Sequence, residues 1–148
     1  MEWDQIDWDE KVWNLPDTLT KNRKPHTLPL SGLALEVLRE TPQINKQGFV
    51  FPARGSTVTT FSGFGKAKNR LDREVEIDDW RLHDLRRTAA TGMAKLGAPP
   101  HVVERVLNHS TGQLGGVAGI YNRFQYLDEM REALELWAVH VMQLQTAK

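Results

Sequence analysis

The chain has 148 residues and a mass of 16.9 kDa, the usual size of a single domain. Its composition, 40% hydrophobic and 26% charged, excludes a disordered or collagen-like chain, and the lack of cysteine excludes disulfide scaffolds, thiol catalysis and cysteine-ligated zinc. No apolar stretch approaches the ~18 residues that cross a bilayer, and the first residues are acidic, so we expect a soluble cytoplasmic domain with no membrane contact.

The net charge of zero conceals a pattern along the chain. Residues 1–17 hold six acids and one base, whereas residues 18–73 hold ten bases and three acids. Residues 80–123 are again basic, and acidic residues return after position 127. A basic middle predicts a surface that faces phosphate groups, although chance variation in charge would produce the same pattern.

The first half of the chain predicts a hairpin. Lys11–Leu15 and His26–Leu30 have the length and composition of short strands, and a polar, basic stretch connects them. The tip of this hairpin is expected to project three cations: Lys21, Arg23 and Lys24.

Two helices and a third strand are expected next. Ser31 is a suitable N-cap for a helix over Gly32–Glu40, and Phe49–Phe51 is expected to form the third strand. Thr60–Val75 is expected to form a helix with an exposed basic face. The cations of that face are Lys66, Lys68, Arg70 and Arg73.

The second half predicts three further helices, over Trp80–Gly97, from Pro99-Pro100 to about Leu107, and over Leu127–Leu144. A glycine-rich loop over 110–119 separates the last two. The apolar residues of the first of these helices fall on one stripe, which predicts a core-facing side: Leu82, Leu85, Ala89, Met93 and Leu96. The fold class is therefore α+β, mostly helical with a small three-stranded antiparallel sheet.

Five polar positions stand at the expected element ends or in loops: Lys21, His83, Arg86, His109 and Tyr121. His83 and Arg86 are close together because they are three residues apart on one helix. Taken singly, each of the five has an ordinary structural explanation, such as a solvated lysine or a tyrosine that covers the core. The five histidines of the chain share no metal-ligand spacing, so no metal site is expected.

Taken together, these positions lie in short segments that form a recognisable series. The segments are Thr20-Lys21-Asn22, His26-Thr27-Leu28-Pro29-Leu30-Ser31, His83-Asp84-Leu85-Arg86-Arg87-Thr88, Leu107-Asn108-His109-Ser110 and Ile120-Tyr121-Asn122-Arg123. The series resembles the catalytic domain of the tyrosine recombinases, the phage-integrase family, from near Met1 to about Val141. The resemblance implies a site-specific recombinase that cuts and rejoins DNA through a 3′-phosphotyrosine intermediate, and the DNA breaking-rejoining fold.

The resemblance also implies a role for each of the five residues. Tyr121 is the nucleophile that attacks the DNA phosphodiester, and Arg86 holds the non-bridging oxygens of the scissile phosphate. His83 and His109 hydrogen-bond that phosphate or assist proton transfer, and Lys21 protonates the leaving 5′-oxygen. Because these side chains supply the positive charge, no metal or nucleotide cofactor is expected.

The chain departs from the family pattern at its start. Members carry a first catalytic arginine just upstream of a segment that resembles residues 1–7, where this chain begins. We therefore expect 1–148 to be an N-terminally truncated catalytic domain without that arginine or the N-terminal DNA-binding domain, and to be inactive alone. The spacing of twelve between His109 and Tyr121 is also long, so Tyr126 stays an alternative nucleophile, with Tyr121 favoured by its Tyr-Asn-Arg context.

The expected partners are double-stranded DNA and other recombinase protomers in a tetramer, in a bacterial or phage-encoded, nucleoid-associated protein. The cations expected to contact DNA are Arg23, Lys24, Lys66, Lys68 and Arg87. Two other functions fit the same residues. One is a non-catalytic module that binds DNA or a recombinase, and the other is an enzyme similar to type IB topoisomerases.

Overall fold

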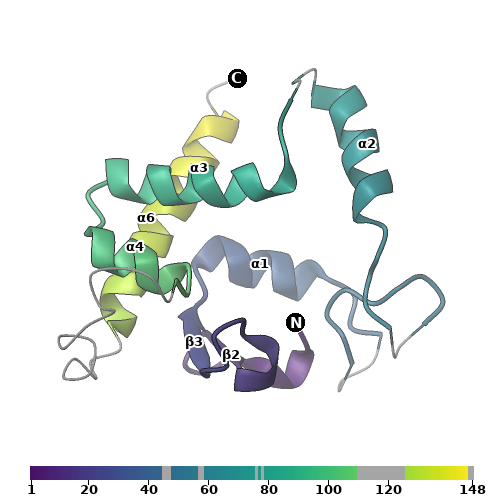
Figure 1. Ribbon diagram of the computed structural model, residues 1–148, viewed down its shortest axis with the longest axis horizontal. Helices are drawn as coiled ribbons and strands as arrows, with labels where there is room; N and C mark the ends of the chain where they lie inside the picture. Colours follow the sequence, from purple (N-terminus) through teal and green to yellow (C-terminus); the bar gives the residue numbers. More distant parts are fainter. Residues whose placement is uncertain (45–47, 57–58, 76, 78, 110–125, 147–148) are drawn as a thin grey trace.

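A computed structural model describes residues 1–44, 48–56, 59–75, 77, 79–109 and 126–146. Helix α1 (Gly32–Glu40) lies against the sheet, α6 (Leu127–Thr146) runs past both, and α3 (Leu82–Lys95) and α4 (Pro100–Val106) pack on α6 (Figure 1). The architecture is mostly helical with a three-stranded antiparallel sheet, which confirms the expected fold class.

The sheet has the order β1 (Ile6–Asp7), β2 (Val12–Leu15) and β3 (His26–Pro29). Strands β2 and β3 pair antiparallel from Val12 opposite Pro29 to Leu15 opposite His26, so the predicted hairpin is confirmed. A short 3₁₀ helix, η2 (Asp17–Leu19), lies within its connection.

The third strand of the sheet is β1 and not Phe49–Phe51, so that expectation was wrong. Phe49 makes only an isolated bridge to Glu2, while the Val50 N–H donates to the Met1 carbonyl at 3.1 Å. These contacts involve only the few residues that precede η1 (Trp3–Gln5), which are too few to form a strand. The segment still contributes to packing, since Val50 is fully buried.

Helix α1 (Gly32–Glu40) packs on the sheet and has the predicted bounds. Ser31 Oγ accepts a hydrogen bond from the Ala34 N–H at 3.4 Å, which confirms the N-cap. A carboxylate oxygen of Glu135, from α6, accepts from the Gly32 N–H at 2.9 Å and ties α1 to the last helix. The core between the sheet and α1 consists of Trp3, Ile6, Leu30, Leu35, Leu38 and Val50.

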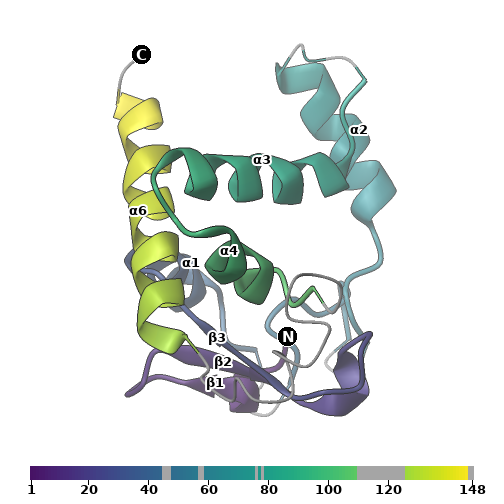
Figure 2. The same cartoon turned by 60° about the vertical axis from the view of Figure 1, so that its left-hand side comes forward.

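A second core lies between α3 (Leu82–Lys95), α4 (Pro100–Val106) and α6 (Leu127–Thr146). Its buried residues are Met93, Ala98, Val102, Val103, Met130 and Ala133. Figure 2 shows α3 crossing α6, with α4 between α3 and the sheet. All three helices begin and end within a few residues of their expected limits.

The predicted core stripe of α3 is only half correct. Met93 is 1% exposed, but Leu82 and Leu85 are 42% and 58% exposed, and Leu96 at the C-cap is also exposed. The reason is that the second core contacts α3 around Ala90 and Met93, in the C-terminal half of the helix. An apolar stripe predicts a side that can be buried, not how far along the helix a partner extends.

Helix α2 (Phe64–Val75) begins four residues later than expected. The preceding residues are held extended, because Thr60 bridges Pro52 and the Phe61 N–H donates to the Phe51 carbonyl at 3.0 Å. None of its residues is buried, and the helix stands apart from the sheet beyond the start of α3 (Figure 2).

Candidate active site

The turn after α4, Leu107–His109, is the centre of the candidate site. Asn108 has a left-handed backbone with φ of 50°, its N–H donates to the Arg105 carbonyl at 2.9 Å, and the His109 N–H donates to the Glu104 carbonyl at 3.0 Å. These two bonds are the Schellman ending of a helix, and asparagine tolerates the left-handed position better than most residues. The turn therefore fixes the backbone that carries His109.

His109 is exposed, and its ring is oriented by α4 itself. Its Nδ1 lies 2.8 Å from a carboxylate oxygen of Glu104. Because both side chains keep access to water, this contact contributes little to stability, about 1 kcal/mol or less. The contact orients the ring: Nδ1 is occupied, and within the described residues Nε2 has no partner and is available to a ligand.

Arg86 reaches the same turn from α3. Its Nη2 donates to the Leu107 carbonyl, and the side chain is otherwise exposed. A guanidinium has five N–H donors, so this bond leaves most of them available for an anion. His83, also exposed, lies one turn earlier on α3 and next to Arg86 on the helix surface.

The tip of the β2–β3 hairpin approaches the turn from the other side. Thr20 is buried, and its hydroxyl donates to the Lys24 carbonyl at 2.7 Å and so closes the tip into a compact loop. The Asn22 side-chain amide donates to Asn108 Oδ1 at 3.0 Å. Lys21, directly before Asn22, is exposed.

The structure thus brings two of the predicted residues, Arg86 and His109, to one place, together with the hairpin loop that carries Lys21. Tyr121 lies outside the described residues. Three residues that contact this place were not predicted, namely Asn22, Glu104 and Asn108. Only Asn108 had a signal in the sequence, since an asparagine directly after the last apolar residue of a helix is typical of a left-handed cap.

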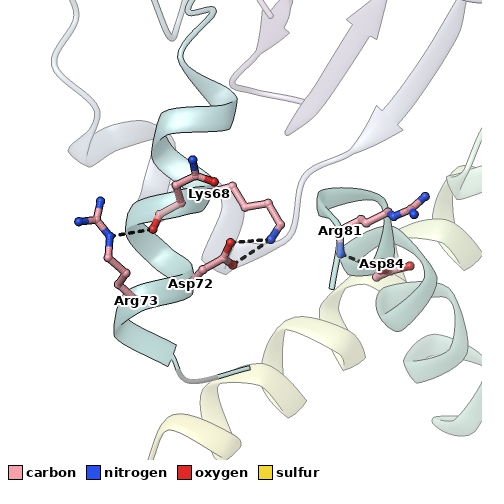
Figure 3. A network of polar contacts seen from close by, with 6 residues as sticks. Lys68, Asp72, Arg73, Arg81 and Asp84 are labelled. Atoms are coloured by element: carbon pink, nitrogen blue, oxygen red, sulfur yellow. Dashed lines mark hydrogen bonds and ion pairs between the residues drawn. The ribbon is translucent and has the colours of Figure 1, made fainter. Parts of the chain in front are cut away.

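Asp84 fixes the start of α3 (Figure 3). Its carboxylate accepts from the Arg81 N–H at 2.8 Å, which satisfies a backbone group ahead of the first turn. The same carboxylate lies 3.3 Å from Nη1 of Arg87. Arg87 remains largely exposed, so this contact is weak and leaves the cation available to a phosphate.

Lys68 does not lie on an exposed basic face as expected. Its side chain is 24% exposed, and its Nζ lies 2.8 Å from the Asp72 carboxylate (Figure 3). The same Nζ lies 4.4 Å from the centre of the Trp80 ring. The expectation was wrong because the sequence does not show that Trp80 folds back against α2. Lys66 on α2, and Arg23 and Lys24 at the hairpin tip, are exposed as expected.

Tyr126 directly precedes α6 and packs against α4. Its ring meets the His101 ring edge-on at 5.0 Å and lies 5.8 Å from the Arg105 guanidinium. Its backbone carbonyl accepts from the Met130 N–H at 2.9 Å, at the start of α6. These contacts are those of a residue that anchors a helix.

His26 on β3 is the one residue with a clearly displaced pKa in the described part of the chain. Burial lowers the pKa of its imidazole below the ordinary value of 6.5, and the positive charge of Arg105 lowers it further. Its Nε2 is buried and has no hydrogen-bond partner among the described residues. His26 is therefore neutral at physiological pH.

Among the described residues, no group of three His, Asp or Glu side chains is arranged to hold a metal ion. Among the helices in these ranges, none is both long and apolar enough to cross a membrane.

Comparison with known proteins gives the family. The model of the Phage integrase family matches residues 1–126. Prophage integrase IntA of Escherichia coli K12 is 30% identical over 138 residues, which cover 92% of this chain and 32% of that protein. The integrase of Shigella phage Sf6 is 29% identical over 141 residues, 93% of this chain and 36% of the phage protein. The shufflon-specific DNA recombinase of Escherichia coli is 34% identical over 98 residues, 66% of this chain and 23% of that protein.

The chain thus spans about a third of the length of the integrases that it matches over most of its own length. No solved structure matches it. Since the family model covers most of the chain, including every segment on which the resemblance rests, the protein belongs to the phage integrase family.

Proposed function

We propose that this chain is the catalytic part of a tyrosine-type site-specific recombinase, which breaks and rejoins DNA strands through a 3′-phosphotyrosine. The observation that carries the proposal is the convergence of Arg86, His109 and the Lys21 hairpin on the turn Leu107–His109. All three are cationic or can become so, which suits a phosphodiester, and family membership supports the assignment.

In the proposed reaction, the Tyr121 hydroxyl oxygen attacks the scissile phosphorus. A P–O bond to tyrosine forms, the bond to the 5′-oxygen breaks, and Lys21 donates the proton that this oxygen takes up. A tyrosine with pKa ≈ 10 is about a thousandth ionised at pH 7, a handicap of roughly 4 kcal/mol. Positive charge near the hydroxyl offsets it, and His83 and His109 are the candidates to accept or relay the tyrosine proton.

Arg86 and the two histidines stabilise the charge that develops on the non-bridging oxygens. An arginine fork supplies two parallel hydrogen bonds to such oxygens, and its contact with Leu107 holds it in place beforehand. The phosphotyrosyl bond conserves the energy of the broken linkage, so rejoining consists of the reverse attack by a 5′-hydroxyl. The proposed reaction therefore uses no metal and no nucleotide.

Double-stranded DNA is the proposed partner, and further recombinase protomers are proposed to complete a tetramer on it. Arg23, Lys24, Lys66 and Arg87 are exposed and are the proposed phosphate contacts. Lys68 joins them only by exchanging the Asp72 carboxylate for a phosphate. The proposed setting is the bacterial cytoplasm, where the DNA lies.

We propose that the 148-residue chain alone cleaves DNA very slowly. The resemblance implies a second arginine at the phosphate, whereas Arg86 is the arginine that the described residues bring to the Leu107–His109 turn. Losing one preorganised donor of this kind typically costs 10²–10³ in rate. A chain that cleaves little can still bind DNA or a recombinase, which keeps the non-catalytic function as the second candidate.

The test is covalent trapping with the full-length gene product and with the 148-residue chain. The substrate is a nicked duplex that covers the junction between the mobile element and its host DNA. We expect the full-length protein to form an adduct that survives denaturant, Tyr121→Phe to abolish it, and Tyr126→Phe to retain it. No adduct with the full-length protein, or loss with Tyr126→Phe alone, would overturn the proposed reaction or its nucleophile.

A further inference from the structure

We propose that Asn22 and Asn108 form a positioning pair, which holds the hairpin tip against the turn after α4 so that the Lys21 ammonium meets the leaving 5′-oxygen. This inference rests on the proposed function, because it assigns the pair to proton donation by Lys21. Neither asparagine touches the reacting atoms in this account, and both act through their neighbours in the chain, Lys21 and His109.

The hydrogen bond joins two loops that are far apart in the sequence. Asn22 Nδ2 donates to Asn108 Oδ1 at 3.0 Å across 86 residues, and both side chains are partly buried. The other end of the Asn22 amide is also engaged, since its Oδ1 accepts from the Lys24 N–H at 3.2 Å. The Asn22 side chain thus has both polar atoms assigned and a single orientation.

Asn108 is held just as firmly on the other side. The Schellman bonds fix its backbone, and its left-handed φ of 50° directs the chain from α4 toward His109. The residue before it, Leu107, accepts the bond from Arg86. One turn therefore binds Arg86 from α3 and itself carries His109 and the anchor of the lysine loop.

Lysine needs such an anchor more than the other residues of the site do. Its ammonium ends a flexible four-carbon side chain, whereas the fork of Arg86 and the ring of His109 already have their own contacts. Lys21 is exposed at the tip of a hairpin, so the tip must be fixed for the ammonium to lie near one oxygen. A displacement of about 1 Å at a reacting group can cost about 100-fold in rate.

The two tasks of Asn108 can be separated by substitution. Asn108→Gly retains the left-handed turn, because glycine adopts positive φ freely, but removes the side chain that binds Asn22. Asn108→Asp retains the acceptor oxygen and is the conservative variant. Asn14→Ala is the matched control, because it removes a bond of 2.9 Å from Thr27 in the same hairpin, away from the tip.

The experiment compares single-turnover cleavage of two substrates by the full-length protein. One is ordinary DNA, and the other carries sulfur in place of the leaving 5′-oxygen, where the thiolate departs without a proton because a thiol is far more acidic than an alcohol. We expect Asn108→Gly and Asn22→Ala to slow cleavage of ordinary DNA about 10-fold or more and to cleave the sulfur substrate at close to the normal rate. Asn14→Ala should be close to wild type on both. Asn108→Asp keeps the acceptor for Asn22 but adds a negative charge beside the phosphate, so it should slow both substrates to the same extent, without the rescue by sulfur.

Equal slowing of Asn108→Gly on the two substrates, or no slowing on either, overturns the positioning role. Lys21→Ala separates this failure from that of the proposed function. If Lys21→Ala is restored by sulfur while Asn108→Gly is not, only the positioning pair fails. If Lys21→Ala is equally slow on both substrates, the proton donor assigned in the proposed function is wrong, and the pair falls with it.

Discussion

The two halves of helix α3 differ in what they contact. Around Ala90 and Met93 the helix packs on α4 and α6, and its end is closed by Gly97 in a left-handed turn. The first half keeps two leucines exposed and carries His83 and Arg86. The difference indicates that one half anchors the helix in the fold, and that the other presents polar groups at the surface, where the proposed DNA substrate could contact them.

The largest effect on stability is expected in the anchoring half. Met93→Ala should lower the free energy of unfolding by about 2–5 kcal/mol, because Met93 is fully buried and a cavity would remain. Leu85→Ala on the presenting half should change it by about 0.5 kcal/mol or less, since that side chain is exposed. Urea unfolding measures both, and equal losses would mean that the two halves are not distinct.

Gly92 tests how closely α3 approaches α6. A Cβ at this position would lie 2.1 Å from the Trp137 ring, so Gly92→Ala should destabilise the fold by about 1–3 kcal/mol. Gly65 is the matched control on α2, where a Cβ would meet nothing within 4 Å. Gly65→Ala should be neutral or stabilising by up to about 1 kcal/mol. Thermal unfolding checks the pair, and a neutral Gly92→Ala would show that the two helices can separate cheaply.

His26, on strand β3 of the sheet, should make the stability of the fold depend on pH. Because burial and Arg105 lower its pKa in the folded state, the unfolded chain binds the proton first as the pH falls below about 6.5. Its contribution to stability is therefore present above that pH and is lost toward lower pH, until the folded-state pKa is passed. Tm measured from pH 7.5 to 5 should fall less steeply in His26→Gln than in the wild type. Parallel curves would remove His26 as the cause.

The smallest effect concerns the cations of α2. Lys66→Gln should reduce the slope of log affinity against log salt by about one, because it removes an exposed cation that we propose contacts a phosphate. Lys68→Gln should reduce it less, since Lys68 is paired with Asp72 and packed on Trp80. Binding titrations of the junction duplex at several salt concentrations give both slopes. A larger change for Lys68 would mean that DNA displaces the Asp72 contact.

Local signals in the sequence predicted most of the secondary structure. Ser31 marked the start of α1, and Gly97 marked the end of α3, because caps depend on neighbouring residues alone. The strand at Phe49–Phe51 and the burial of Leu82 and Leu85 were wrong, since both depend on which distant segment lies alongside.

The candidate site, like the fold, was predicted only in part. The resemblance supplied Arg86 and His109 as candidates, and the structure supplied their supports, Glu104 and Asn108. A hydrogen bond between Asn22 and Asn108 cannot be predicted from either local sequence, because it depends on how the hairpin packs against α4.

The most direct test of the difference between the two halves of α3 is the Arg86→Ala variant of the full-length protein, assayed for single-turnover cleavage alongside its Tm. Arg86 is exposed, and the Leu107 carbonyl is its one hydrogen-bond partner within the described residues, so the free energy of unfolding should fall by about 1 kcal/mol or less. Cleavage should slow by about 10² to 10³ or more, because a preorganised donor to the phosphate is lost. A variant that cleaves at the wild-type rate, or that loses activity only because it unfolds, would contradict the assignment of chemistry to this half of α3.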